Sequence, residues 1–382
     1  MSKPAIQQRF VALFCALILL ALASCSEDPS SAGSDLFPPG VRLDSVVVYA
    51  RSSSTYRAPI TGNSHTLLLG QYQRIECRML LQFGPLNLAI SDTSILAATV
   101  KLRRRYWFRD SLGTLAFTVH KLSDSLSLSL WNENTIKFSE TEALYEPTIL
   151  GEYSKTMSPT DTFVTFNLDT ALIRGWLRDG LSYPRGILLK PTPASTIVYG
   201  FTSIYTLYED IRPELILRYR SGDSSTIYTV QEAFVATGDS VGTLPEHVIM
   251  QSGLADRGLL RFDVSGIPRS ASITDARIEF VRDLTMSVRN EFSVDSVLVQ
   301  LLLDEGSPPT GGVSTVARGE TEGDTLFQAD AKPIVQYWAT GKPNYGVALR
   351  AMGEITTLDR FAVFGAGSIH RPRLRIVYSV LR

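Results

Sequence analysis

The sequence GLLRF at residues 258–262, followed by ITDARIEF at residues 273–280, decides the fold because an earlier part of the chain repeats it. The earlier copy reads MLLQF at residues 79–83 and ILAATVKL at residues 95–102. The isoleucine follows the phenylalanine by 12 residues in the first copy and by 11 in the second. The same two patterns in the same order predict a tandem duplication.

Three later landmarks keep this order in both copies. An apolar stretch ends in Trp176 or Trp338, a glycine opens the next apolar run, and an Arg-Pro pair opens the last strand. The paired segments are 172–176 with 334–338, Tyr183 with Tyr345, 186–190 with 346–350, and 212–219 with 371–378. Five ordered matches support the duplication, and we expect both tryptophans in equivalent cores.

The local pattern between the landmarks is that of β-strands. Val100, Leu102, Tyr106 and Phe108 share one parity, while polar residues and Trp107 take the other, as in a strand with one buried face. Only Asp169–Leu177 and Asp330–Ala339 resemble short helices, with Thr170 or Asp330 as the N-cap. Many short strands with Gly and Pro turns predict an all-β protein with two tandem antiparallel, jelly-roll-like β-sandwiches.

The N-terminus has the features of a targeting signal. Lys3 and Arg9 precede an apolar run from Phe10 to Ala23, which is the length of a signal-peptide core. Leu22-Ala23-Ser24-Cys25 resembles a bacterial lipobox, which implies cleavage before Cys25 and acylation of that cysteine. Bacterial lipoproteins are held on a membrane by such an anchor, so the expected membrane partner is reached through Cys25.

The remaining chain divides by composition. Residues 1–24 form the expected signal peptide, and residues 25–43, rich in Pro, Gly and Ser, the expected flexible tether. A polar stretch at 221–225 places the expected boundary between sandwich domains at 44–221 and 222–382. Ser26 lacks the aspartate that retains enteric lipoproteins at the inner membrane, and Glu27-Asp28 resembles acidic export signals. The expected location is therefore the bacterial outer membrane or cell surface.

Charge and cysteine content argue against a nucleic-acid-binding protein and against an intramolecular disulfide. The chain has 37 basic and 38 acidic residues, and removal of Lys3 and Arg9 leaves 35 against 38, a net charge of −3. This balance argues against a nucleic-acid partner. After Cys15 leaves with the signal and Cys25 is acylated, Cys77 is alone, so no intramolecular disulfide is expected.

The second copy resembles a known family over most of its length. Leu259–Pro268, the segment of Trp338, Asn344–Leu349 and the closing Arg371-Pro372 strand resemble a DNRLRE-domain protein. In the first copy, Trp131–Phe138 resembles that family's Trp-x-Glu-x-Thr-Val-x-Trp segment, with Phe138 where the second tryptophan is usual. These extracellular β-sandwich modules include carbohydrate-binding modules, so the resemblance implies a sandwich fold and carbohydrate binding.

Catalytic and metal motifs give little support for an enzyme. Gly-Asp-Ser-Val-Gly at 238–242 satisfies the G-x-S-x-G pattern of an esterase, but Pro245 follows where a helix is needed. None of the four histidines lies three residues after an aspartate, and no pair has helical zinc spacing (His65, His120, His247 and His370). We interpret the motif as a Gly-rich turn and expect no catalytic residues, cofactor or metal, with a structural Ca²⁺ open only by analogy with other β-sandwich modules.

The candidate ligand-binding residues lie on one strand. Alternation puts four cations around one indole on the outer face of the first sandwich, at Lys101, Arg103, Arg105, Trp107 and Arg109. Guanidinium groups pair with carboxylate or sulfate, and Trp107 would stack on sugar rings, so this row suits an acidic polysaccharide. The alternative is an ordinary solvated face or a charged edge strand that resists aggregation. The predicted function is thus a surface-anchored, non-catalytic, carbohydrate-binding lipoprotein. The alternatives are a structural or adhesive protein with an unidentified protein partner, and, third, an esterase or polysaccharide-degrading enzyme.

Overall fold

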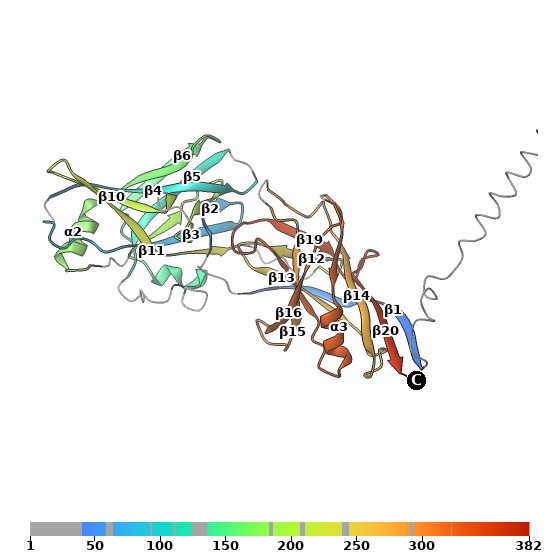
Figure 1. Cartoon of the computed structure of the whole chain (residues 1–382). Helices are drawn as coiled ribbons and strands as arrows, with labels where there is room; N and C mark the ends of the chain where they lie inside the picture. The colour runs from blue at the N-terminus through green and yellow to red at the C-terminus, as the bar shows by residue number, and fades with distance from the viewer. Residues whose placement is uncertain are drawn as a thin grey trace, which may run out of the picture.

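The computed structural model contains two β-sandwich bodies that lie end to end (Figure 1). It describes residues 40–58, 64–91, 94–109, 112–123, 131, 136–182, 186–206, 211–238, 244–290, 293–321 and 323–381. The signal peptide, Cys25, Tyr183 and most of the esterase-like motif fall outside these residues. The predicted all-β fold with antiparallel sandwiches is confirmed.

Within the described residues, the elements of the N-terminal body include ten strands and two short helical segments. Its elements are β2 (Thr66–Tyr72), β3 (Ile75–Phe83), β4 (Ile95–Trp107), β5 (Gly113–Lys121), η3 (Phe138–Ala143), β6 (Gly151–Met157), β7 (Phe163–Leu168), α2 (Thr170–Arg178), β8 (Ile187–Pro191), β9 (Val198–Thr202), β10 (Glu214–Tyr219) and β11 (Ser224–Thr237).

The C-terminal body contains ten strands and one helix. Its elements are β1 (Val41–Arg57), β12 (His247–Gln251), β13 (Asp256–Phe262), β14 (Ser272–Val281), β15 (Val297–Leu302), β16 (Gly311–Ala317), β17 (Leu326–Asp330), α3 (Lys332–Ala339), β18 (Val347–Ala351), β19 (Arg360–Phe364) and β20 (Arg373–Leu381).

The pairings of β1–β10 recur in β11–β20. In the N-terminal body β4 pairs with β7 and β10, β8 pairs with β3 and β5, and β2 pairs with β9. In the C-terminal body β14 pairs with β17 and β20, β18 pairs with β13 and β15, and β12 pairs with β19. The repeated landmarks therefore mark equivalent strands of two ten-strand units.

The first strand of each unit lies in the other unit's body. β1 pairs with β20 through residues 41–49 and with β13 through residues 50–57. β11 pairs with β10 and then with β3. The expected division at 221/222 is therefore wrong as a boundary between sheets, and the expected tether cannot extend to residue 43 because β1 begins at Val41.

The two exchanged strands occupy equivalent positions. Tyr49 lies opposite Arg373 on β20, and Tyr228 lies opposite Glu214 on β10. Both strands then pass one irregular position and continue along the second sheet of the body. A short hairpin explains why β11 stays with β10, since Tyr219 N donates to Asp223 O and Gly222 has a φ of +93°. The first strand of the second unit is thus held by the first body, and β1 completes the second.

An ion pair to a buried carboxylate is specific to one of these exchanged strands. Arg57 at the end of β1 lies opposite Asp256, and its guanidinium Nε is 2.8 Å from the Asp256 carboxylate, which is 3% exposed. The equivalent place in the N-terminal body pairs Ala236 with Cys77. β1 therefore carries the cation that the C-terminal body requires, because an unpaired buried carboxylate is costly.

Each body has one main core between its sheets. Trp176 on α2 is 1% exposed and Trp338 on α3 is 5% exposed, and they belong to the two main clusters. The predicted burial of both tryptophans is confirmed. Gly186 and Gly346 precede β8 and β18 with φ of +91° and +92°, and a Cβ on either would lie 2.3 Å from a backbone oxygen of the neighbouring strand. This close approach requires glycine in both units.

The junction between bodies combines an apolar cluster with a polar network. Tyr106 of β4 and Phe108, which follows the strand, pack in a cluster that includes Leu358 of the C-terminal body. The Tyr106 hydroxyl accepts from Leu358 N at 3.0 Å and from Asn290 Nδ2 at 2.9 Å. Asp359 accepts from Ser293 Oγ at 2.6 Å. These contacts fix the end of β4 against the second body.

A buried carboxyl on β11 gives a pH-dependent prediction. Burial raises the pKa of Glu232 from 4.5 to about 7, although Ile204 N and Thr229 donate to this side chain. Between these pH values the unfolded chain loses the proton while the folded chain keeps it, so this group's contribution to stability falls as pH rises. In Glu232→Gln the loss is absent, so the melting temperature of the variant relative to wild type should increase from about pH 5 to about pH 8. A difference in melting temperature between Glu232→Gln and wild type that stays the same from about pH 5 to about pH 8 would contradict this prediction.

Candidate functional site

The row of residues predicted on β4 is only partly on one face. Val100 and Leu102 are buried in the N-terminal core, and Lys101 and Arg103 lie half-buried on the opposite, outer face. Tyr106 and Phe108 are also buried, as expected, but in the junction cluster on the other side of the sheet. The predicted burial of the apolar residues is confirmed, whereas strict alternation along the strand is wrong.

A β-bulge near Arg105 changes the parity. Arg104 lies opposite Phe201, but Tyr106 lies opposite the preceding residue, Gly200, so Arg105 is the extra residue and is exposed. After this bulge Trp107 packs against the N-terminal core and shares a ring contact with Arg104, whose guanidinium carbon is 5.6 Å from the ring centroid. Trp107 therefore does not lie on the outer face with Lys101 and Arg103, because one extra residue reverses the pleat.

The predicted residue Arg109 belongs to the junction. It has a φ of +66°, and its backbone N donates to Asn290 Oδ1 at 2.7 Å. Its guanidinium donates to the Tyr72 hydroxyl at 3.3 Å. The structure thus brings Lys101 and Arg103 together, leaves exposed Arg105 beside them in the chain, and separates Trp107 and Arg109.

The aromatic ring beside Lys101 and Arg103 on the outer face is that of Phe163, not that of Trp107. The sequence analysis did not single out Phe163. Phe163 opens β7 directly opposite Arg103 and is 39% exposed. Lys101 Nζ lies 4.5 Å and the Arg103 guanidinium carbon 6.0 Å from its ring centroid. Lys101 Nζ also lies 2.8 Å from Glu214 on β10. The alternating pattern of β7 predicts this placement only once its pairing with β4 is known.

A second charged network lies over the other sheet of the N-terminal body. Glu142 accepts from Tyr145, Lys190 and Arg78, and these contacts lower the pKa of Glu142 to about 2, with the Tyr145 hydrogen bond as the largest cause. The Arg78 guanidinium also lies 4.3 Å from the Phe138 ring. Trp131 is buried in a small cluster beside this network. Trp131, Ile136 and Phe138, which are described residues of the Trp131–Phe138 segment, therefore pack in a cluster with Leu80 of β3 and Leu188 of β8.

One histidine pairs with a carboxylate. His247 Nε2 lies 3.0 Å from Asp283 Oδ2, and Asp283 also accepts from Thr285 N and Met286 N. The sequence spacing does not reveal this pair because β12 and the turn after β14 meet only in the fold. Ser240 of the esterase-like motif lies outside the described residues.

The described residues contain neither a candidate metal centre nor a membrane-spanning helix. Among the described residues, no group of three or more His, Cys, Asp or Glu side chains is placed to hold a metal ion. Within those same ranges, no helix is both long and apolar enough to cross a membrane.

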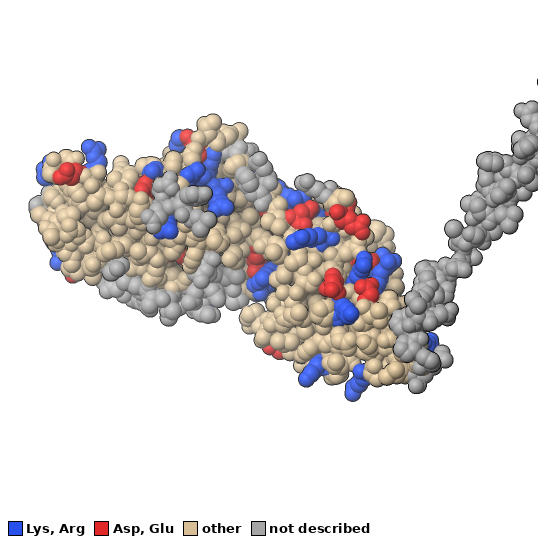
Figure 2. All heavy atoms as spheres, viewed as in Figure 1, with Lys and Arg blue, Asp and Glu red and all other residues tan. Residues whose placement is uncertain are grey.

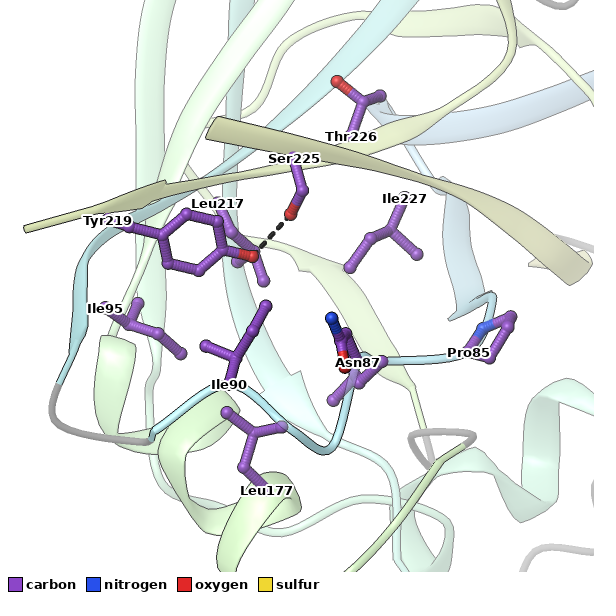
Figure 3. Close-up of a pocket in the computed structure, with 11 residues that line it drawn as sticks. Pro85, Asn87, Ile90, Ile95, Leu177, Leu217, Tyr219, Ser225, Thr226 and Ile227 are labelled. Carbon is purple, nitrogen blue, oxygen red and sulfur yellow. Dashed lines mark hydrogen bonds between the residues drawn. The ribbon is translucent and has the colours of Figure 1, made fainter. Parts of the chain in front are cut away.

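A cavity of about 220 Å³ opens at the far end of the N-terminal body (Figure 3). Its walls are mainly apolar, from Leu86, Ile90, Ile95, Leu177, Leu217 and Ile227. The hydroxyl of Tyr219, at the rim of the cavity, shares a hydrogen bond of 2.6 Å with Ser225 Oγ. In the C-terminal body Val46 takes the place of Ser225 and packs against the core.

Comparisons with known proteins leave the family open. No protein-family model and no curated protein matches this chain. The solved structures that it resembles include a Macrobrachium rosenbergii nodavirus, at 9% identity and a TM-score of 0.11, covering 89% of this chain and 90% of that one. They also include the infectious bursal disease virus VP2 subviral particle, at 10% identity and a TM-score of 0.14, covering 89% and 77%. Similarity at this level carries no argument about function.

Proposed function

We propose that this protein is a surface-anchored, non-catalytic lipoprotein that binds an acidic polysaccharide. The observation that carries the proposal is the exposed Phe163 ring with Lys101 and Arg103 above it on an outer sheet face. An apolar ring can contact the CH groups of a sugar while adjacent guanidinium groups pair with carboxylate or sulfate. Arg105, exposed at the bulge, adds a further cation beside them.

Binding to acidic glycans tests the ligand class. The mature chain should bind a polyuronate and a dextran sulfate but not neutral dextran, and binding should weaken with added salt because the contacts are exposed. Replacing Arg103 and Arg105 together with alanine should weaken binding by about tenfold or more, because charge-assisted hydrogen bonds are lost. Calorimetric titration measures both effects. Unchanged affinity of this double variant would remove these residues from the site.

The membrane anchor has a separate test. Cys25→Ser should move the protein out of the membrane fraction or block its maturation, because the thiol that would carry the acyl chain is absent. Cell fractionation and metabolic labelling with a fatty-acid analogue measure this. A native protein that takes no label would reject the lipoprotein proposal while leaving glycan binding to its own test.

A structural or adhesive role with a protein partner is the second candidate. It is favoured by the reciprocal exchange of β1 and β11, which joins the two bodies along with the Tyr106–Asn290 contact. A folded mature chain that binds no acidic or neutral glycan would favour this role.

A further inference from the structure

The outer face of the C-terminal body carries a compact group of arginines that the sequence analysis did not single out. Arg371 precedes β20, and Arg373 and Arg375 follow at alternate positions, so the three point to the same side. Neighbouring alternate positions are about 7 Å apart along a strand. We call Tyr49, Arg371, Arg373, Arg375 and Glu279 the arginine face.

Glu279 fixes two of these guanidinium groups. Arg373 Nε lies 2.6 Å from one carboxylate oxygen of Glu279, and Arg375 Nε lies 3.4 Å from the other. The Glu279 side chain is only 5% exposed because these arginines cover it, whereas the Arg373 and Arg375 side chains are 36% and 57% exposed. The closest contact of each arginine with Glu279 is through Nε, and Arg373 also shares a side-chain hydrogen bond with Tyr49.

The third arginine is held by an aromatic ring. The Arg371 guanidinium carbon lies 4.6 Å from the centroid of Tyr49, which is 45% exposed on β1. Val47, two positions earlier on the same strand, is 47% exposed. Stacking restricts Arg371 before any ligand arrives, which lowers the conformational cost of binding.

The arginine face is the counterpart of the outer face of the N-terminal body that carries Lys101, Arg103 and Phe163. The basic and acidic residues of its central ion pair have exchanged strands. Lys101 on β4 pairs with Glu214 on β10, while at the equivalent places Glu279 on β14 pairs with Arg373 on β20. The next row is Ile216 in the N-terminal body and Arg375 in the C-terminal body. The row of Arg375 also holds Arg277 on β14, which lies opposite Asp330 on β17 and 3.7 Å from Asp275, so arginines outnumber carboxylates on this side by one. In Figure 2 basic and acidic side chains lie close together on the C-terminal body, consistent with such local pairing.

We infer that the arginine face is a second binding site for acidic polysaccharide, so that each body contributes one site. This inference rests on the proposed function and deepens it. The face is flat and exposed, its guanidinium groups are positioned in advance, and its aromatic and apolar side chains suit a sugar backbone. Guanidinium groups bind carboxylate or sulfate in a bidentate manner, which suits a repeating polyanion better than a single ion. A chain long enough to reach both bodies gains from bivalence.

The decisive variant removes Arg371 and Arg375 and keeps the closer ion pair of Glu279, which is with Arg373. In the mature chain, Arg371→Gln with Arg375→Gln should weaken polyuronate binding by about tenfold or more, while a melting curve shows that the body remains folded. Arg178→Gln with Arg269→Gln changes two other exposed arginines and the net charge by the same amount, and should leave affinity unchanged. Arg371→Lys with Arg375→Lys should bind with intermediate affinity, because charge is kept and bidentate geometry is lost.

The outcomes separate this inference from the proposed function. If Arg103→Ala with Arg105→Ala weakens binding and the arginine-face variant does not, the second site is rejected and the proposed function stands. If both pairs weaken binding and their combination weakens it further, the second site is supported. If no acidic glycan binds, both proposals fail. Tighter binding to vesicles containing anionic phospholipid than to polyuronate, lost in the arginine-face variant, would instead assign the face to a membrane surface and overturn the inference.

Discussion

Trp176→Ala should lower the free energy of unfolding of the N-terminal body by about 3–5 kcal/mol, the usual cost of emptying a large buried aromatic site. Trp176 is 1% exposed and lies in the main core beneath α2. Among the described residues its indole Nε1 has no hydrogen-bond partner, so the loss comes from packing. Denaturant unfolding, monitored by far-ultraviolet circular dichroism, measures the change.

Two matched variants show whether packing is the cause. Trp176→Phe should cost much less, because it keeps an aromatic ring and removes an unbonded N–H. Trp338→Ala should produce a similar loss in the C-terminal body, since Trp338 occupies the equivalent place on α3. A Trp176→Ala protein within about 1 kcal/mol of wild type would show that this side chain does not support its core.

Removal of β1 should unfold the C-terminal body and leave the N-terminal body folded. A chain that begins at Ala58 loses every pairing of β20 and β13 with β1, and it exposes the carboxylate of Asp256. The N-terminal body keeps β11, which is the strand it uses from the second unit. Hydrogen exchange measured by mass spectrometry should show loss of protection across β12 to β20, while β2 to β11 stay protected.

The opposite result is equally informative. A division at 221/222 assigns β1 to the N-terminal body, and under that assignment the same truncation would expose β3 and β10. Deprotection of β3 and β10 with a protected C-terminal body would therefore contradict the strand exchange. Arg57→Ala in the full chain should give a milder loss confined to the C-terminal body, because it leaves Asp256 buried without its cation.

Sequence patterns predicted the elements of the fold better than their partners. The landmarks at β3, β4, β10 and their second-unit equivalents depend on alternation and on glycine positions such as Gly186, which local backbone geometry requires. The sequence did not reveal the exchange of β1, because the residues around Tyr49 in β1 and around Tyr228 in β11 follow the same strand pattern. The cation at Arg57 and its partner Asp256 on β13 distinguish β1 from β11, and these two residues are separated by 199 positions.

The candidate site shows the same division between local and long-range information. Parity correctly placed Val100, Leu102, Lys101 and Arg103, but it failed at Arg105 because a bulge depends on the neighbouring strand β9. Phe163 became relevant only through its pairing with Arg103. The arginine face was missed because the comparison of copies followed β14 alone, whereas its cations lie on β20.

The position of β1 also determines how the molecule carries mechanical load. If the proposed anchor holds the chain through Cys25, tension enters at Val41 and passes along a strand hydrogen-bonded to β20 and then to β13. A pull along the strand axis loads this series of backbone hydrogen bonds together instead of opening them one at a time. The C-terminal body thus resists the force first, although it is formed mainly by the last part of the chain. The N-terminal body is displayed farther from the anchored end.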